Sequence, residues 1–172
     1  MKAQEIIAGR IAAEKRLNTA SSLQFELVGE LRKIFSGMLL KKCDGTYGEP
    51  NVYPQRLPLA QSDDEDEMSF APYVTVILND FSIDSWDEPK KIKVIILMCA
   101  WDGGDERTGD RDNSIIMDKI LERFGKFPEI GNFTLDLPIE GAWQEEDTYP
   151  YFYSALELNF LAPTYRREDD LA

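Results

Sequence analysis

The sequence predicts an α+β domain: a mostly antiparallel sheet with N-terminal helices and one inserted helix packed on it. Apolar residues recur at helical spacing near the N-terminus and again between two strand-like runs, whereas elsewhere they alternate with polar residues. With 172 residues, 43% of them hydrophobic, the chain has the length of one domain with a real core. We therefore expect a single domain over 1–172, comprising a helical N-terminal segment at 1–40, an irregular acidic loop region at 41–72 and a sheet-plus-helix core at 73–165.

Two helices are expected in the first forty residues. Apolar residues about 3.6 positions apart mark each of them: Ile6, Ile7 and Ile11 in the first, and Leu27, Val28, Leu31, Ile34, Phe35 and Met38 in the second. Ser21 and Gln24 stand at capping-box spacing. The second helix should therefore run from about Ser22 to Phe35, with Gly37 closing it, and its apolar stripe should lie against the sheet.

Glycines and prolines interrupt the next thirty residues, which also contain a block of five consecutive acids: Asp63, Asp64, Glu65, Asp66 and Glu67. Such a block repels itself and favours a solvated loop. A short strand is expected between Val52 and Leu59, and its prolines would confine it to the edge of the sheet.

The core begins with two strands, Tyr73–Leu78 and Lys91–Trp101, joined by a long hairpin loop. The unbroken apolar run Val94–Ala100 predicts a strand covered on both faces. A helix follows, with Asp110 or Asp112 near its N-cap, and its expected apolar side is Ile115, Ile116, Ile120, Leu121 and Phe124.

Alternating patterns predict two further strands, around Phe133–Leu137 and Ala155–Phe160, connected by an acidic loop at 141–150. The end of the chain, from Arg166 to Ala172, is expected to fray.

Charge and composition exclude several classes of protein. There are 32 acidic and 19 basic residues, so the net charge is −13 and the pI is about 4.4. This argues against a main role in gripping nucleic-acid phosphates, and against binding to an anionic membrane. Because histidine is absent, Ser–His–Asp and Cys–His catalysis and His-ligated zinc are excluded.

We expect an intracellular protein with no membrane association and no cofactor. No apolar run approaches the roughly 20 residues that span a bilayer, and the N-terminus has no signal-peptide core. The lone thiols of Cys43 and Cys99 fit a reducing cytosol.

Two sets of residues are candidates for a site. Asp102, Asp105, Asp110 and Asp112 lie between a strand and a helix and offer oxygen ligands of the kind that Mg²⁺ and Ca²⁺ prefer. Their spacing does not match an EF-hand, however, so a loop whose last acids favour the positive end of the helix is the preferred interpretation. Tyr151 and Tyr153, in an aromatic strand start, are candidate interface residues because tyrosine is enriched at protein interfaces.

The order of these segments resembles the tail terminator (tail completion) proteins of tailed bacteriophages and phage-like particles. The resemblance runs from about Phe70 to Arg167, and it is carried by Phe70–Val76, Ile92–Trp101, the Gly/Asp turn, Ile115–Phe124, Phe133–Ile139 and Tyr149–Tyr151. Members of that family are small α+β subunits that form a hexameric ring on the end of the tail tube. The ring stops tube polymerisation and offers a surface to the head-side connector, while DNA passes through without tight binding.

The resemblance implies a non-enzymatic structural protein of the virion, in the neck region of the tail, assembled in the host cytoplasm. Its implied partners are further copies of itself, the tail tube protein and a head–tail connector protein. A negative lumen would keep DNA from sticking to the wall. The acids at 63–67 or at 102–112 are the candidates for that lumen.

Three alternatives remain. The first is a head–tail connector or stopper component of the same virion neck. The second is a metal-dependent enzyme with the carboxylate site at 102–112. The third is an acidic module that mimics nucleic-acid charge and blocks a basic partner. A metal titration of the melting temperature and the salt sensitivity of a complex would separate the last two from the ring subunit.

Overall fold

The computed structural model describes residues 18–59 and 70–164 and confirms the α+β class. Its elements follow the chain in this order: α2 (Ala20–Ile34), β1 (Leu40–Lys41), β2 (Tyr47–Gly48), β3 (Asn51–Pro54), β4 (Tyr73–Ser82), β5 (Lys90–Trp101), α3 (Gly109–Lys126), β6 (Glu129–Ile130), β7 (Phe133–Trp143) and β8 (Tyr151–Ala162). The expected first helix, the acids at 63–67 and the chain end from Arg166 lie outside the described residues. None of the helices described is long and apolar enough to cross a membrane.

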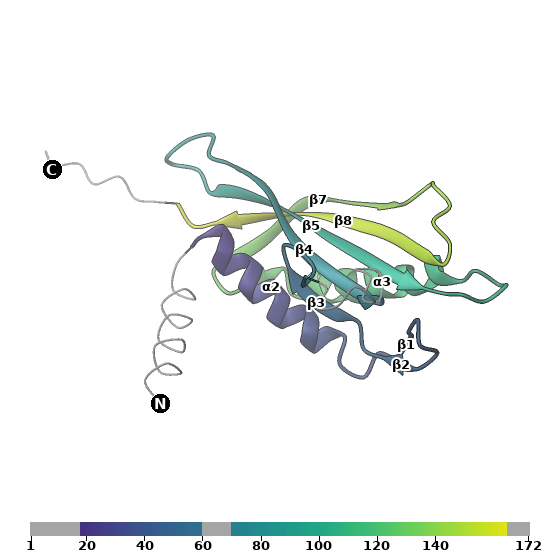
Figure 1. Cartoon of the computed structure of the whole chain (residues 1–172). Coiled ribbons are helices and arrows are strands. Elements are labelled where there is room, and N and C mark those ends of the chain that lie inside the picture. The colour runs from purple at the N-terminus through teal and green to yellow at the C-terminus, as the bar shows by residue number, and fades with distance from the viewer. Residues whose placement is uncertain (1–17, 60–69, 165–172) are drawn as a thin grey trace, which may run out of the picture.

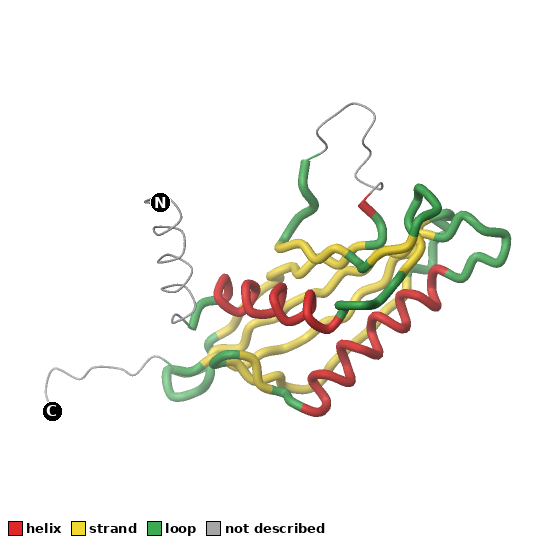
Figure 2. Tube along the Cα trace, turned by 90° about the horizontal axis from the view of Figure 1, so that it is seen from below, coloured by secondary structure: helices red, strands yellow, loops and turns green. Residues whose placement is uncertain are grey.

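Six strands form one sheet in the order β3-β4-β5-β8-β7-β6. β3 runs parallel to β4, and all other neighbours in this sheet are antiparallel. β1 and β2 form a separate hairpin. Both helices lie on one face of the large sheet, α2 beside β3 and β4 and α3 across β5 and β8 (Figure 1, Figure 2). No described helix covers the opposite face, which we call the open face.

Alternate side chains of β5 build the core beneath the helices. Residues pointing to the helix side are fully buried, namely Ile92, Val94, Ile96 and Met98, whereas Ile95 and Leu97 on the open face are only half-buried. The prediction that this strand is covered on both faces is therefore wrong for most of its length. A continuous apolar run shows that a strand is apolar on both sides, but it does not show that both sides are covered by helices.

α2 begins earlier than its sequence pattern predicted. Thr19 is its N-cap: the Thr19 hydroxyl accepts from the Ser22 N–H at 3.1 Å, and the Ser22 hydroxyl accepts from the Thr19 N–H at 3.1 Å. The reciprocal pair replaces the predicted Ser21–Gln24 box. The predicted C-terminal signal is present, because Gly37 has a φ of +79° shortly after the helix ends.

α3 starts in close contact with β8. Thr108 is its N-cap, and Asp110 and Asp112 lie in the first turn, where their charge favours the positive end of the helix. A Cβ at Gly109 would lie 2.1 Å from the ring of Phe152, so glycine is required for this approach.

The predicted apolar side of α3 was too wide. Ile116, Ile120 and Phe124 are buried, but Ile115 is 41% exposed and Leu121 is 37% exposed. A helix on one sheet face buries a single stripe, and these two residues lie outside it.

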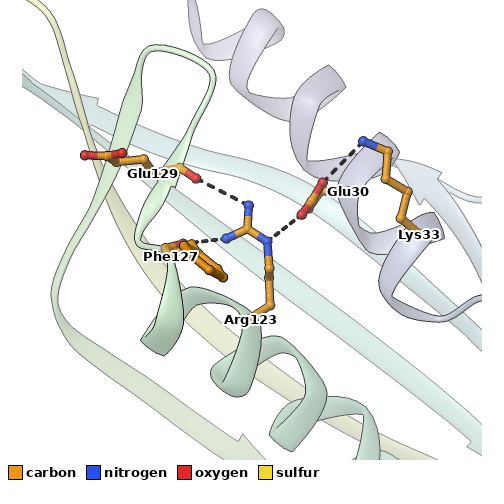
Figure 3. Close-up of polar contacts among 5 residues, drawn as sticks. All are labelled: Glu30, Lys33, Arg123, Phe127 and Glu129. Carbon is orange, nitrogen blue, oxygen red and sulfur yellow. Dashed lines mark hydrogen bonds and ion pairs between the residues drawn. The ribbon is translucent and has the colours of Figure 1, made fainter.

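The two helices are joined by an ion pair between Arg123 of α3 and Glu30 of α2 (Figure 3). The Arg123 guanidinium also donates to the carbonyl oxygens of Phe127 and Glu129, just beyond the end of α3. Burial opposes ionisation of Glu30, but the hydrogen bond and charge of Arg123, assisted by Lys33, outweigh it and lower the pKa of Glu30.

One edge of the sheet is closed by side chains. β3 ends at Pro54, and Gln55, with a φ of +61°, donates its N–H to the Val76 carbonyl at 2.9 Å. The Gln55 side chain then accepts from the Leu78 N–H at 2.9 Å and donates to the Leu78 carbonyl at 3.4 Å. Gln24 of α2 also donates to the Val76 carbonyl, at 2.7 Å. These contacts use the backbone groups of Val76 and Leu78 that would otherwise be free to pair with a strand of another molecule.

The opposite edge is open. β6 pairs with only the first two residues of β7, and no described strand lies outside β7 from Asp136 to Trp143. The Gln144 N–H donates to the Tyr153 carbonyl at 3.0 Å. Because antiparallel strands alternate the direction of their backbone groups, Gly141 and Trp143 point theirs away from β8.

Several boundaries differ from the predictions. The strand expected over 52–59 is the short β3, which is an edge strand as predicted. The hairpin loop expected after Leu78 and the acidic loop expected at 141–150 are both shorter than predicted, because β4 continues to Ser82 and β7 to Trp143. Both continuations contain a register shift, next to Asn79 in β4 and between Asp136 and Glu140 in β7. A bulge interrupts the alternation by which a strand is identified from sequence.

Candidate functional site

Two loops meet at one end of the sheet, 102–108 after β5 and 144–150 before β8, and we call them the loop end. Arg107 forms an ion pair with Asp147, and its guanidinium lies 5.2 Å from the ring centre of Tyr149. The Tyr149 N–H donates to the Asp147 carboxylate at 3.1 Å. Segments 40 residues apart in sequence are therefore held together here.

Asp102 anchors the first of these loops. Its carboxylate accepts from the Gly104 N–H at 2.9 Å, the Thr108 N–H at 2.6 Å and the Thr108 hydroxyl at 2.9 Å. Lys41 lies 3.7 Å from the carboxylate, and the Asp102 N–H donates to the Pro150 carbonyl at 2.9 Å. Burial opposes ionisation, but these donors outweigh it and lower the pKa of Asp102.

A hollow of about 410 Å³ lies beside Asp102. The Lys41 ammonium lies 5.3 Å from the ring centre of Trp101 at this hollow, within cation–π range. Asp112 is half-buried, and burial together with the negative charge of Asp102 raises the pKa of Asp112. The hollow thus places carboxylates beside an aromatic wall, and its lining is Leu39, Leu40, Lys41, Tyr47, Trp101, Asp102, Gly104, Asp105, Glu106, Thr108 and Asp112.

The four aspartates of the suggested metal set do not converge on one point: Asp102 and Asp105 lie in the loop end, and Asp110 and Asp112 lie in the first turn of α3. The Asp102 carboxylate already accepts hydrogen bonds from the backbone of its own loop, Asp112 is half-buried, and Asp105 and Asp110 are exposed. Over residues 18–59 and 70–164, no three aspartate, glutamate or cysteine side chains are grouped so that they could hold a metal ion.

Tyr151 and Tyr153 both lie at the start of β8, on the open face. Tyr153 of β8 lies directly opposite Cys99 of the neighbouring strand β5, and Cys99 lies opposite Tyr73 of β4 on its other side. Burial raises the pKa of the Cys99 thiol to about 11 and that of Tyr153 to about 12, and it also raises the pKa of Tyr73. These groups are neutral near pH 7, so the row contains no activated nucleophile. Tyr73 and Cys99 are buried in a small second core on this face, and Tyr151 and Tyr153 at its margin are half-buried.

The open face changes character along the strands. Beyond the aromatic row it carries half-buried apolar side chains, and these are Ile77, Ile95, Leu97, Ala155 and Leu161. Near the β4–β5 hairpin it becomes charged: Lys93 forms an ion pair with Glu157 at 3.0 Å, with Asp80 and Glu140 close by. Half-buried apolar side chains in such a row suit a surface that another molecule covers.

Sequence reasoning placed Tyr151, Tyr153 and Asp102 in candidate sites but missed Lys41 and Tyr73. Lys41 reaches the hollow through the β1–β2 hairpin, which lies in the region expected to be irregular. The acids at 63–67, the other candidates for a lumen, lie outside the described residues.

The sequence matches no protein-family model, and a comparison with curated protein sequences finds no relative.

Proposed function

We propose that this protein is a non-enzymatic ring subunit that caps the tail tube of a bacteriophage or phage-like particle and joins it to the head-side connector. The observation that carries the proposal is the incomplete covering of the sheet: both described helices lie on one face, while much of the open face carries only half-buried side chains and the outer edge of β7 has no neighbouring strand within the described residues. The resemblance of residues 70–167 to tail terminator proteins supports it.

The two sheet edges differ in a way that favours a ring. A closed ring needs head-to-tail contacts, in which each copy contributes two different surfaces. The β7 edge exposes backbone groups and large apolar side chains, with Leu137 75% and Trp143 49% exposed. The β3–β4 edge is closed by Gln55 and Gln24. Pairing of two identical β3–β4 edges is therefore disfavoured, and the open β7 edge is available to a different surface of the next copy.

Charge supports passage of DNA without tight binding. The net charge is −13, and Asp105 and Glu106 of the loop end are exposed, as is Asp110 in the first turn of α3. If these acids, or those at 63–67, line the lumen, they repel the phosphates of the passing duplex.

The test has two parts. Light scattering after size-exclusion chromatography, over a concentration series, should give about 118 kDa for six copies of 19.7 kDa. Purified tail tubes should then bind the protein at one end and stop growing. Binding to the connector but not to tubes would identify a connector or stopper component instead. A protein that stays monomeric at high concentration and binds neither would overturn the proposal.

A further inference from the structure

The hollow beside Asp102 joins a polar floor to an apolar mouth. Two of its lining residues, Leu39 and Tyr47, are each 65% exposed and stand at the mouth. Deeper in, Asp102 is buried and Asp112 is half-buried. The volume of about 410 Å³ lies within the range of roughly 300–1,000 Å³ that is common for ligand pockets. A ligand that matches this hollow therefore has a polar head on an apolar stem.

The charge of the lining decides the sign of that head. Four carboxylates line the hollow against a single ammonium, that of Lys41, and they belong to Asp102, Asp105, Glu106 and Asp112. An anion would be repelled by this surplus of negative charge, whereas a cation is attracted to it.

Lys41 shows that a cation fits against the aromatic wall. Its ammonium lies 5.3 Å from the ring centre of Trp101, within cation–π range, and this contact is independent of the carboxylates. The ammonium is held loosely, because it lies 3.7 Å from the Asp102 carboxylate and a charge-assisted hydrogen bond is about 2.7–2.9 Å long. The Asp102 carboxylate already accepts from the N–H groups of Gly104 and Thr108. Another cation can therefore displace Lys41 at little cost.

Asp112 lacks a counter-charge at the hollow. In the part of the chain that the structure describes, its carboxylate forms no ion pair. Burial and the negative charge of Asp102 raise the pKa of Asp112, and the positive charge of Arg111 opposes them with a smaller effect. A second cation in the hollow would favour the ionised carboxylate. Asp112 is thus a carboxylate left for an external partner.

We propose that the hollow binds an arginine or lysine side chain of a partner protein, with its head group between Trp101 and Asp112. The aliphatic stem of that side chain lies against Leu39 and Tyr47, and its head group replaces the Lys41 ammonium. Arginine suits the hollow better than lysine, because a planar guanidinium stacks on an indole while it pairs with a carboxylate. This inference goes beyond the proposed ring and does not depend on it.

Two tripeptides test the chemistry of the ligand. N-acetyl-Gly-Arg-Gly-amide carries the guanidinium, and the same peptide with citrulline has nearly the same shape without the charge. The full chain is titrated with each peptide at constant ionic strength, and NMR follows the indole N–H signal of Trp101, assigned through Trp101→Phe. We expect a saturable shift with the arginine peptide and about tenfold weaker binding of the citrulline peptide. Equal binding of the two peptides would overturn the proposal.

Substitutions in the chain test the roles of Lys41 and Asp112. Lys41→Met removes the competing ammonium and should strengthen binding of the arginine peptide about fivefold, whereas Asp112→Asn should weaken it about fivefold. The matched controls are Lys42→Met, in the same hairpin, and Asp110→Asn, in the same first turn of α3. Neither control residue lines the hollow, so both variants should bind like the wild type.

The comparison within each pair is decisive, because both members carry the same change in net charge. Binding by Lys41→Met that is no tighter than binding by Lys42→Met would contradict the displacement. Equal affinities of Asp112→Asn and Asp110→Asn would remove Asp112 from the site. If Lys41→Met gave no saturable shift with the arginine peptide, the hollow would not be a binding site for such side chains. Melting temperatures of the four variants show that each is folded.

Discussion

The side-chain amide of Gln55 pairs with both backbone groups of Leu78, so that one side chain stands where a further strand would lie. The chain can turn away after Pro54 because Gln55 adopts a left-handed conformation. The sheet is thereby closed at β4 and stays open at β7 within the described residues.

Replacing Gln55 with alanine should open the β4 edge. Gln55→Ala removes two hydrogen bonds to Leu78 and should lower the free energy of unfolding by about 1–2 kcal/mol. The exposed edge should also increase self-association with concentration. Thermal unfolding and sedimentation velocity measure the two effects.

Gln55→Gly separates edge closure from backbone strain. Glycine adopts the positive φ easily, so this variant should be more stable than Gln55→Ala by up to about 1 kcal/mol. It should still associate as strongly as Gln55→Ala. If glycine restored wild-type behaviour in both measurements, the side-chain amide would have no role at the edge.

The Glu30–Arg123 pair should couple α2 to α3. Both side chains are about four-fifths buried, and a double-mutant cycle with Glu30→Gln and Arg123→Met should give a coupling of about 1 kcal/mol. Urea unfolding provides the four stabilities. The matched control is the exposed pair Lys126–Glu122, whose coupling should lie within error of zero.

Asp102 should make stability depend on acid pH. Its pKa in the folded state lies below the ordinary value of about 3.9, so its contribution is present above that value and is lost as pH falls through the folded pKa. Asp102→Asn should therefore cost about 2 kcal/mol near pH 7 and progressively less below pH 4. The exposed Asp105→Asn is the control, and an equal loss at pH 7 and pH 2.5 would contradict the assignment.

The β7 edge should contribute to assembly. Leu137 is largely exposed, so Leu137→Lys should leave the melting temperature unchanged while placing a charge on the edge. We expect at least a tenfold weaker association by light scattering. Ile115→Lys, on the exposed side of α3, should associate like the wild type. If both variants assembled normally, β7 would not be a subunit interface.

Neutralising the exposed acids of the loop end and of the adjoining first turn of α3 should affect DNA passage and not folding. The variant Asp105→Asn, Glu106→Gln and Asp110→Asn should still form rings, because these side chains are exposed. Particles that carry it should eject DNA more slowly, since a less negative wall attracts phosphates more. Unchanged ejection would place these acids outside the lumen.

The regular parts of the fold could be predicted because each has a local signal. β5, β8 and α3 show long apolar patterns, and their existence was predicted correctly. Other parts have weak local signals, namely the cap at Thr19 and the two-residue β6. The continuation of β7 through Pro138 was not predicted because a register shift interrupts the strand there. A side chain that closes an edge, such as Gln55, becomes visible only when the tertiary neighbours are known.

The candidate site was predictable only in part. The acids at 102–112 could be found because they are neighbours in sequence, but their separate environments could not. Hydrogen bonds from its own loop lower the pKa of Asp102, whereas burial and the negative charge of Asp102 raise the pKa of Asp112. The row from Tyr73 through Cys99 to Tyr153 depends on strand pairing across 80 residues of chain, and no local pattern specifies such a register.

The contrast between the two cysteines has a practical consequence. Cys99 is fully buried and burial raises its pKa to about 11, so it should resist maleimides, while Cys43 is exposed on the turn of the β1–β2 hairpin. The wild-type chain thus offers one site for a fluorophore or a heavy-atom cluster without any substitution. Counting the labels on a single particle would then count the copies of the protein in it.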